Sequence, residues 1–94
     1  NLGRPGDVLV TVSASGDSEN IIRAIDVAKS GGMQVIAMTG FTGGRAGKVA
    51  DVNLHVAADN YGVAEDIHQG LMHILAHWLR LAHMDPALVP KRKF

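Results

Sequence analysis

The 94-residue sequence contains no cysteine, which excludes a disulfide framework and a zinc site built on thiolates. It has no net charge either, because nine basic residues balance nine acidic ones, and this argues against nucleic-acid binding by bulk electrostatics. No apolar run approaches the length of a membrane span, and no signal pattern opens the chain. We therefore expect a soluble, cytoplasmic protein with neither a nucleic-acid nor a membrane partner.

The chain is long enough for one small domain, and its composition is apolar for that size. Hydrophobic residues make up 47% of it and charged residues only 19%. A small chain has much surface for its volume, so part of this apolar content is expected to meet another chain or a further segment. The first strand pattern begins almost at once, and we expect the chain to be a piece of a longer protein.

Three short apolar runs alternate with three helical patterns. The apolar runs cover residues 7–12, 34–38 and 52–56, and the helical patterns cover about 18–30, 45–50 and 63–83. This β-α-β-α-β-α order predicts an α/β fold, an open parallel sheet with flanking helices of the flavodoxin-like or Rossmann-like type. We expect the first strand to be buried on both faces, as in parallel sheets.

Glycine and proline predict the boundaries. Gly31 and Gly32 are expected to end the first helix as a left-handed cap. Pro86 and Pro90 mark residues 84–94 as an irregular tail, so the core of a single domain over 1–94 is expected at about 5–83.

The loop after the first strand, residues 13–18 with sequence SASGDS, carries three short hydroxyls. Ser13, Ser15 and Ser18 offer hydrogen bonds, Gly16 lets the backbone approach a ligand, and the following helix directs its positive dipole end toward the same place. This serine loop therefore predicts a site for a phosphate or carboxylate. It contains no basic residue, so neutral hydrogen bonds would hold the anion. The alternative is that Ser15 or Ser18 is an ordinary helix N-cap.

Two further loops are expected beside the serine loop. Ligands of open α/β sheets bind beyond the carboxyl ends of the strands, so loops 13–18, 39–44 and 57–62 should share one edge. Thr39 would add a hydroxyl to the site, and Gly43 and Gly44 would permit close approach. The alternative is a plain turn at Thr39 followed by a flexible glycine loop.

The last helix is apolar over more than half of its circumference, which predicts burial on more than one side. The apolar residues are Ile67, Leu71, Ile74, Leu75, Trp78, Leu79 and Leu81. Glu65, Gln69, His73 and His77 occupy the remaining sector. Glu65 and His73, two turns apart, could share a metal or divide acid and base roles, and His73 with His77 could chelate a metal.

The alternative for these histidines is an exposed or structural role. We expect His55, in the third strand, and His83, at the negative end of the helix dipole, to be structural.

Several motifs together resemble one family. They are the Ser-x-Ser-Gly-x-Ser loop at 13–18, the segment 32–40, the Thr-Gly-Gly loop at 42–44, and the ending from Tyr61-Gly62 through His68 and His73. In this order, over about residues 5–83, they resemble the sugar isomerase (SIS) domain family, and within it the phosphoheptose isomerases. The chain looks like the carboxyl-terminal half of such a domain.

The resemblance implies an isomerase of carbohydrate metabolism that interconverts an aldose and a ketose of the sedoheptulose 7-phosphate type through an enediol. Ser13, Ser15 and Ser18, with Thr39, would bind the substrate phosphate. His73 matches a histidine implicated in acid/base chemistry and, in some members, in zinc binding. Glu65 stands where those enzymes carry a glutamine near the substrate or metal.

Other implications concern assembly and departures from the family. Members form homo-oligomers, here expected to be a tetramer, and His68 matches a histidine expected to be structural. Gly62 stands where the enzymes commonly carry an aspartate, and their catalytic glutamate precedes the region matched here. A second interpretation is therefore a non-catalytic phosphosugar-binding or assembly module of the same family.

Overall fold

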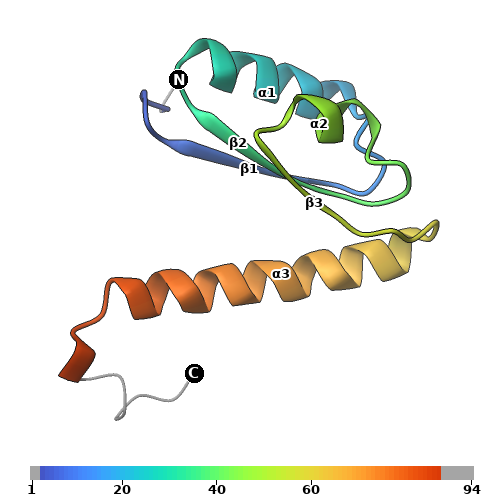
Figure 1. Ribbon diagram of the computed structural model, residues 1–94. Helices are drawn as coiled ribbons and strands as arrows, with labels where there is room; N and C mark the ends of the chain where they lie inside the picture. The colour runs from blue at the N-terminus through green and yellow to red at the C-terminus, as the bar shows by residue number, and fades with distance from the viewer. Residues whose placement is uncertain (1–2, 88–94) are drawn as a thin grey trace.

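The computed structural model describes residues 3–87 and contains a three-stranded parallel sheet with three helices. The elements follow the predicted order: β1 (Val8–Ser13), α1 (Glu19–Ser30), β2 (Gln34–Thr39), α2 (Gly44–Val49), β3 (Val52–His55) and α3 (Tyr61–Ala82). The strands lie in the order β1-β2-β3, with α1 and α2 on one face of the sheet and α3 on the other (Figure 1). The α/β fold class predicted from the sequence is confirmed. Of the predicted tail, residues 88–94 lie outside the described residues.

The core lies between the sheet and the pair α1 and α2. Alternate residues of a strand point to opposite faces, so Leu9 of β1 and its β2 partner Val35 meet these helices. The fully or nearly buried core residues are Ile25, Ala28, Val35, Ala37 and Ala46. This layer fixes β1 beside β2 in a register that pairs Ser13 with Thr39, so both strands end at the same level.

The predicted left-handed cap ends α1. Gly32 has φ +78°, its N–H donates to Lys29 O at 3.1 Å, and the N–H of Met33 donates to Ala28 O at 2.9 Å. These two bonds form a Schellman motif, which satisfies carbonyl groups that the helix end leaves unpaired. The chain reverses here and enters β2 parallel to β1.

The prediction that β1 is buried on both faces is wrong for this chain. Val8, Val10 and Val12 alternate toward α3 and are 51%, 43% and 40% exposed. They are exposed because α3 stands away from this part of the sheet (Figure 1). An apolar groove lies there instead, lined by Val8, Val10, Ile36, Leu75, Trp78 and Leu79.

The prediction that α3 is buried on more than one side is also wrong. Its fully buried residues are Ala64 and His68, in the first two turns, whereas Trp78 is 62% exposed and Ile74 is 64% exposed. Within residues 3–87, the sheet covers only the beginning of this helix. The helix therefore has the apolar side that the sequence predicts, but much of it stays exposed within these residues. No helix in this range is long and apolar enough to cross a bilayer.

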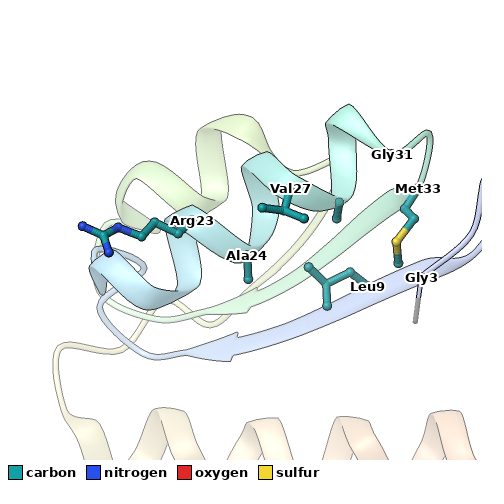
Figure 2. A pocket seen from close by; sticks show the side chains of 8 residues that line it. Gly3, Leu9, Arg23, Ala24, Val27, Gly31 and Met33 are labelled. Atoms are coloured by element: carbon teal, nitrogen blue, oxygen red, sulfur yellow. The ribbon is translucent and has the colours of Figure 1, made fainter. Parts of the chain in front are cut away.

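A second apolar hollow lies between α1 and β1 (Figure 2). It measures about 500 Å³ and is lined by Gly3, Leu9, Arg23, Ala24, Val27, Ala28, Gly31 and Met33. Apart from Arg23, its lining side chains are apolar. The hollow and the groove below the sheet border β1 on both faces.

Candidate functional site

The three post-strand loops meet at one edge of the sheet, as predicted. The N–H of Gly40 donates to Ala14 O at 2.7 Å, which joins the end of β2 to the serine loop. The N–H of Phe41 donates to Ala58 O at 3.0 Å, which joins it to the loop after β3. Parallel strands in register place their carboxyl ends together, and these bonds hold the three loops there.

The serine loop is ordered by its own hydroxyls. Ser13 Oγ accepts a hydrogen bond from the N–H of Gly16 at 3.2 Å, and Ser15 Oγ accepts one from the N–H of Asp17 at 3.3 Å. Such side-chain turns are typical of serine in tight loops. Each hydroxyl still has a hydrogen to donate, so both can serve an anion while they hold the loop.

Ser18 occupies the N-cap position of α1 but does not act as a side-chain cap. Its backbone is extended, with φ −63° and ψ 127°, and its side chain makes no capping hydrogen bond. The alternative interpretation of the serine loop as a helix cap is therefore not realised at Ser18. The exposed hydroxyl lies beside the first turn of α1, where backbone N–H groups carry the positive end of the helix dipole.

Glycine brings the serine loop into backbone contact with the start of α2. A Cβ on Gly16 would lie 2.1 Å from Gly43 O, and a Cβ on Gly44 would lie 2.4 Å from Ser15 O. Both glycines also have positive φ, +69° and +56°. These glycines were expected to let a ligand approach closely, but in the structure they let one loop pack on the other.

Sequence reasoning missed Asp17 and Arg45, which link the same two loops. Asp17 Oδ1 accepts a hydrogen bond from the backbone N–H of Arg45 at 3.0 Å, and Arg45 Nη2 donates to Asp17 O at 2.8 Å. Arg45 Nη1 lies 3.0 Å from Glu19 Oε1. The serine loop has no basic residue of its own, yet it contacts a guanidinium from α2. The signal that could have indicated this pair is the sequence Gly43-Gly44-Arg45, which places a basic residue at the start of a helix on the loop edge.

These contacts shift the pKa of both partners. The hydrogen bond from the Arg45 backbone N–H is the main cause that lowers the pKa of the Asp17 carboxyl, with the guanidinium adding to it. The hydrogen bond to Glu19 is the main cause that raises the pKa of Arg45. Asp17 is therefore a carboxylate at neutral pH, and its charge is paired.

Thr39 lies at the end of β2 with its side chain fully buried. Its hydroxyl donates to Asn53 Oδ1 at 2.7 Å, and His55 Nδ1 lies 3.2 Å from the Thr39 hydroxyl oxygen. The structure thus places this hydroxyl inside the sheet edge, bonded to β3. The contact gives His55 the structural role predicted for it.

His68 is buried beneath the same strand end. Its Nε2 lies 2.8 Å from Thr39 O, and because a carbonyl oxygen can only accept, Nε2 carries the proton. Its Nδ1 is buried without a hydrogen-bond partner in the described part of the chain. The predicted structural role fits this placement, since the histidine ties α3 to the end of β2.

Glu65 and His73 both lie on the exposed surface of α3. Eight residues of helix separate them by about 12 Å along the axis. Residues 3–87 contain no cluster of three or more metal-ligating acidic, histidine or cysteine side chains. The contacts described above join neither residue to the serine loop. Their predicted roles stay predictions.

The beginning of α3 does contact the loop edge. Asn60 Oδ1 accepts a hydrogen bond from the N–H of Val63 at 3.0 Å and caps the helix, so α3 starts at Tyr61, two residues before the predicted start. The rings of Phe41 and Tyr61 pack with centroids 4.7 Å apart. Glu65, in the second turn, is therefore nearer to the loop edge than His73.

Known proteins share the sequence and the fold of this chain. The SIS domain model matches residues 1–40. The phosphoheptose isomerases of Tolumonas auensis and Sodalis glossinidius are 44% and 48% identical over 75 and 77 residues, each covering 79% of this chain and 39% of the relative. A phosphoheptose isomerase structure from Francisella tularensis superposes with a TM-score of 0.76 at 38% identity, covering 79% of this chain and 40% of that one. A structure from Neisseria gonorrhoeae gives 0.76 at 41% identity, covering 78% and 42%.

These matches confirm the predicted resemblance: residues 1–40 match the SIS domain model, and the chain is similar to proteins named phosphoheptose isomerase. The chain spans about two fifths of the length of the relatives it matches, as expected for a part of such a domain.

Proposed function

We propose that this chain is the carboxyl-terminal half of a sugar-phosphate isomerase that converts a ketose phosphate of the sedoheptulose 7-phosphate type into its aldose. The observation that carries the proposal is a serine loop at the carboxyl edge of a parallel sheet, in a chain similar to proteins named phosphoheptose isomerase. A base would remove a proton from C1 of the ketose while an acid protonates the C2 carbonyl oxygen, which gives an enediol. Protonation at C2 and loss of the O1 proton would then complete the aldose.

The serine loop would hold the phosphate. Ser13 and Ser15 are half-buried and held in turns, whereas Ser18 is exposed at the first turn of α1. Hydroxyls and helix N–H groups are donors that suit a phosphate dianion. Anchoring the phosphate would fix C1 and C2 against the acid/base groups, and such positioning accounts for a large part of catalysis.

Thr39 would support the loop edge. Its hydroxyl is already bonded to Asn53, so direct phosphate binding would require that bond to break. We propose that Thr39 acts chiefly through its main chain and its buried side chain, which hold β2 beside β3 where the loops emerge.

His73 would move a proton in the reaction, since imidazole exchanges protons near neutral pH. Glu65 would help to hold the substrate. Their carboxylate and imidazole groups also suit zinc, whose further ligands would come from another segment or subunit, because residues 3–87 supply no cluster of three. Zinc bound there would polarise a substrate oxygen.

A non-catalytic phosphosugar-binding module is the second candidate. Two observations favour it. Gly62 offers no side chain where an aspartate is expected. Asp17, in the serine loop, and Glu19, beside it, are paired with Arg45 and poorly suited to act as a base. In the enzyme, the base would have to come from a segment outside this chain.

We also propose that the protein forms a homo-oligomer, a tetramer by family resemblance. Support comes from the exposed apolar side of α3 and from the hollows that border β1 on both faces. Contiguous exposed apolar surface of this kind usually marks a contact with protein.

The deciding experiment is a calorimetric titration of sedoheptulose 7-phosphate into the longest form of the protein that contains this chain. The matched control is the same protein with Ser13, Ser15 and Ser18 all changed to Ala. Binding that disappears in the triple variant would support the phosphate site, whereas no binding by the folded wild-type protein would contradict it.

Turnover separates the two candidates. Conversion of the ketose phosphate that is lost on His73→Ala would support the isomerase. Binding without conversion would support the binding module.

A further inference from the structure

The guanidinium of Arg45 and the serine loop are joined through both the backbone and the side chain of Asp17. Arg45 Nη2 donates to Asp17 O at 2.8 Å, while Asp17 Oδ1 accepts from the Arg45 backbone N–H at 3.0 Å and lies 3.4 Å from Nε. The third arm, Nη1, reaches Glu19 Oε1 at 3.0 Å. The planar guanidinium thus contacts the residue before Ser18 and the residue after it.

These contacts fix the orientation of one peptide group. A trans peptide directs its C=O and N–H in opposite directions. Because Asp17 O points to Arg45, the N–H of Ser18 points away from Arg45. That N–H belongs to the N-cap residue of α1, so Arg45 sets the direction of a donor at the start of this helix.

The positive charge of Arg45 is already paired with carboxylates. Two carboxylates, Asp17 and Glu19, lie within 3.4 Å of its nitrogens. An anion arriving at the serine loop would therefore meet a cluster with a net charge of −1, and without Arg45 the charge would be −2. The arginine removes repulsion at the loop without offering a free cation to the ligand.

We propose that Arg45 is a positioning residue for the serine loop, holding the 17–18 peptide and neutralising the carboxylates beside it without binding the phosphate itself. The proposal rests on the proposed function of the serine loop as a phosphate site. It goes beyond that function because it assigns the affinity of the loop in part to a residue on a different helix, α2.

The test is the affinity of the longest form of the protein for inorganic phosphate and for sedoheptulose 7-phosphate, measured by calorimetry. Arg45→Ala should weaken both by about tenfold, in line with the loss of a charged hydrogen bond. Arg45→Lys keeps the charge but not the planar fork and should fall between Ala and wild type. In a steady-state assay of a catalytically active form, KM should rise while kcat changes little, because Arg45 is assigned no contact with the reacting carbons.

Lys29 provides a matched control. It forms an exposed ion pair with Asp51, at 3.9 Å, which joins α1 to the segment between α2 and β3. Lys29→Ala should leave phosphate affinity unchanged. Equal losses of affinity in Lys29→Ala and Arg45→Ala would overturn the proposal, since they would indicate a general effect of stability.

Asp17 separates positioning from direct binding. Asp17→Asn removes one of the two repelling carboxylate charges and keeps the Asp17 carbonyl that accepts from Arg45. If Arg45 acts by positioning and neutralisation, Arg45→Ala should cost less phosphate affinity in the Asp17→Asn background than in wild type. If Arg45 binds phosphate directly, its replacement should cost as much or more in that background, which would overturn the proposal. Wild-type protein that binds no phosphate would instead contradict the function of the loop, so the two failures are distinguishable.

Discussion

His68 Nε2 donates a hydrogen bond to the carbonyl oxygen of Thr39 at 2.8 Å, and both side chains are fully buried. The same oxygen accepts from the N–H of Val56 at 2.9 Å. One carbonyl at the end of β2 therefore ties together α3 and the segment after β3, directly beneath the loop edge.

Replacement of His68 should destabilise the protein. His68→Ala removes a fully buried side chain together with its hydrogen bond, and we expect a loss of about 2–4 kcal/mol in the free energy of unfolding. Urea denaturation of the longest form of the protein measures this loss. His83→Ala, at the exposed C-cap of α3, is the control and should cost less than about 1 kcal/mol. Equal losses of unfolding free energy in the two variants would contradict a stabilising role for the buried His68 and its hydrogen bond to Thr39.

Two glycine substitutions should have opposite effects. Gly16→Ala places a Cβ 2.1 Å from Gly43 O at a residue with φ +69°, so we expect a loss of about 2 kcal/mol or more. Gly70→Ala lies in the interior of α3 with no atom within 4 Å of the added Cβ, so we expect a gain of about 0.5–1 kcal/mol. Thermal denaturation of both variants checks the signs. A Gly16→Ala variant as stable as wild type would disprove the backbone contact.

Stability should depend on the ionisation of Asp17. Its pKa is lowered in the folded state, chiefly by the hydrogen bond from the Arg45 backbone N–H, so it contributes stability above its unfolded pKa. That contribution should disappear as the pH falls through the lowered pKa, in the acidic range below the usual aspartate value. Melting temperatures of wild type and Asp17→Asn across this range test it. The two curves should converge at acidic pH, and a constant separation would contradict the linkage.

The apolar side of α3 should be covered in the assembled protein. Trp78 is the only tryptophan in the sequence and is 62% exposed in the chain alone, so its fluorescence reports this surface. In the longest form of the protein, we expect emission at shorter wavelength and protection from acrylamide quenching compared with the unfolded chain. Quenching as strong as in the unfolded chain would show that the helix stays open to solvent.

The elements were predictable because their signals are local. Apolar runs, the Gly31-Gly32 stop and the helical repeat of α3 each depend on neighbouring residues, and the structure confirms their order. Burial was less predictable, because it depends on what lies across the sheet. The valines of β1 and the apolar face of α3 have the composition of buried surface, but within residues 3–87 much of this surface stays exposed.

The position of the site could be predicted from the sequence, but the contacts within it could not. The edge on which the loops meet follows from the parallel order alone. The pairing of Asp17 with Arg45 joins residues 28 positions apart and depends on how two loops pack, which no local pattern encodes. The roles of Glu65 and His73 stay predictions.

The backbone contact between the serine loop and the start of α2 also constrains how the sequence can change. Neither Gly16 nor Gly44 can gain a side chain unless the two backbones separate, because each added Cβ would overlap main-chain atoms of the other loop. A substitution at one position would be tolerated only if a compensating change moved the other loop. The two glycines should therefore persist or disappear together among related sequences, as a single inherited unit.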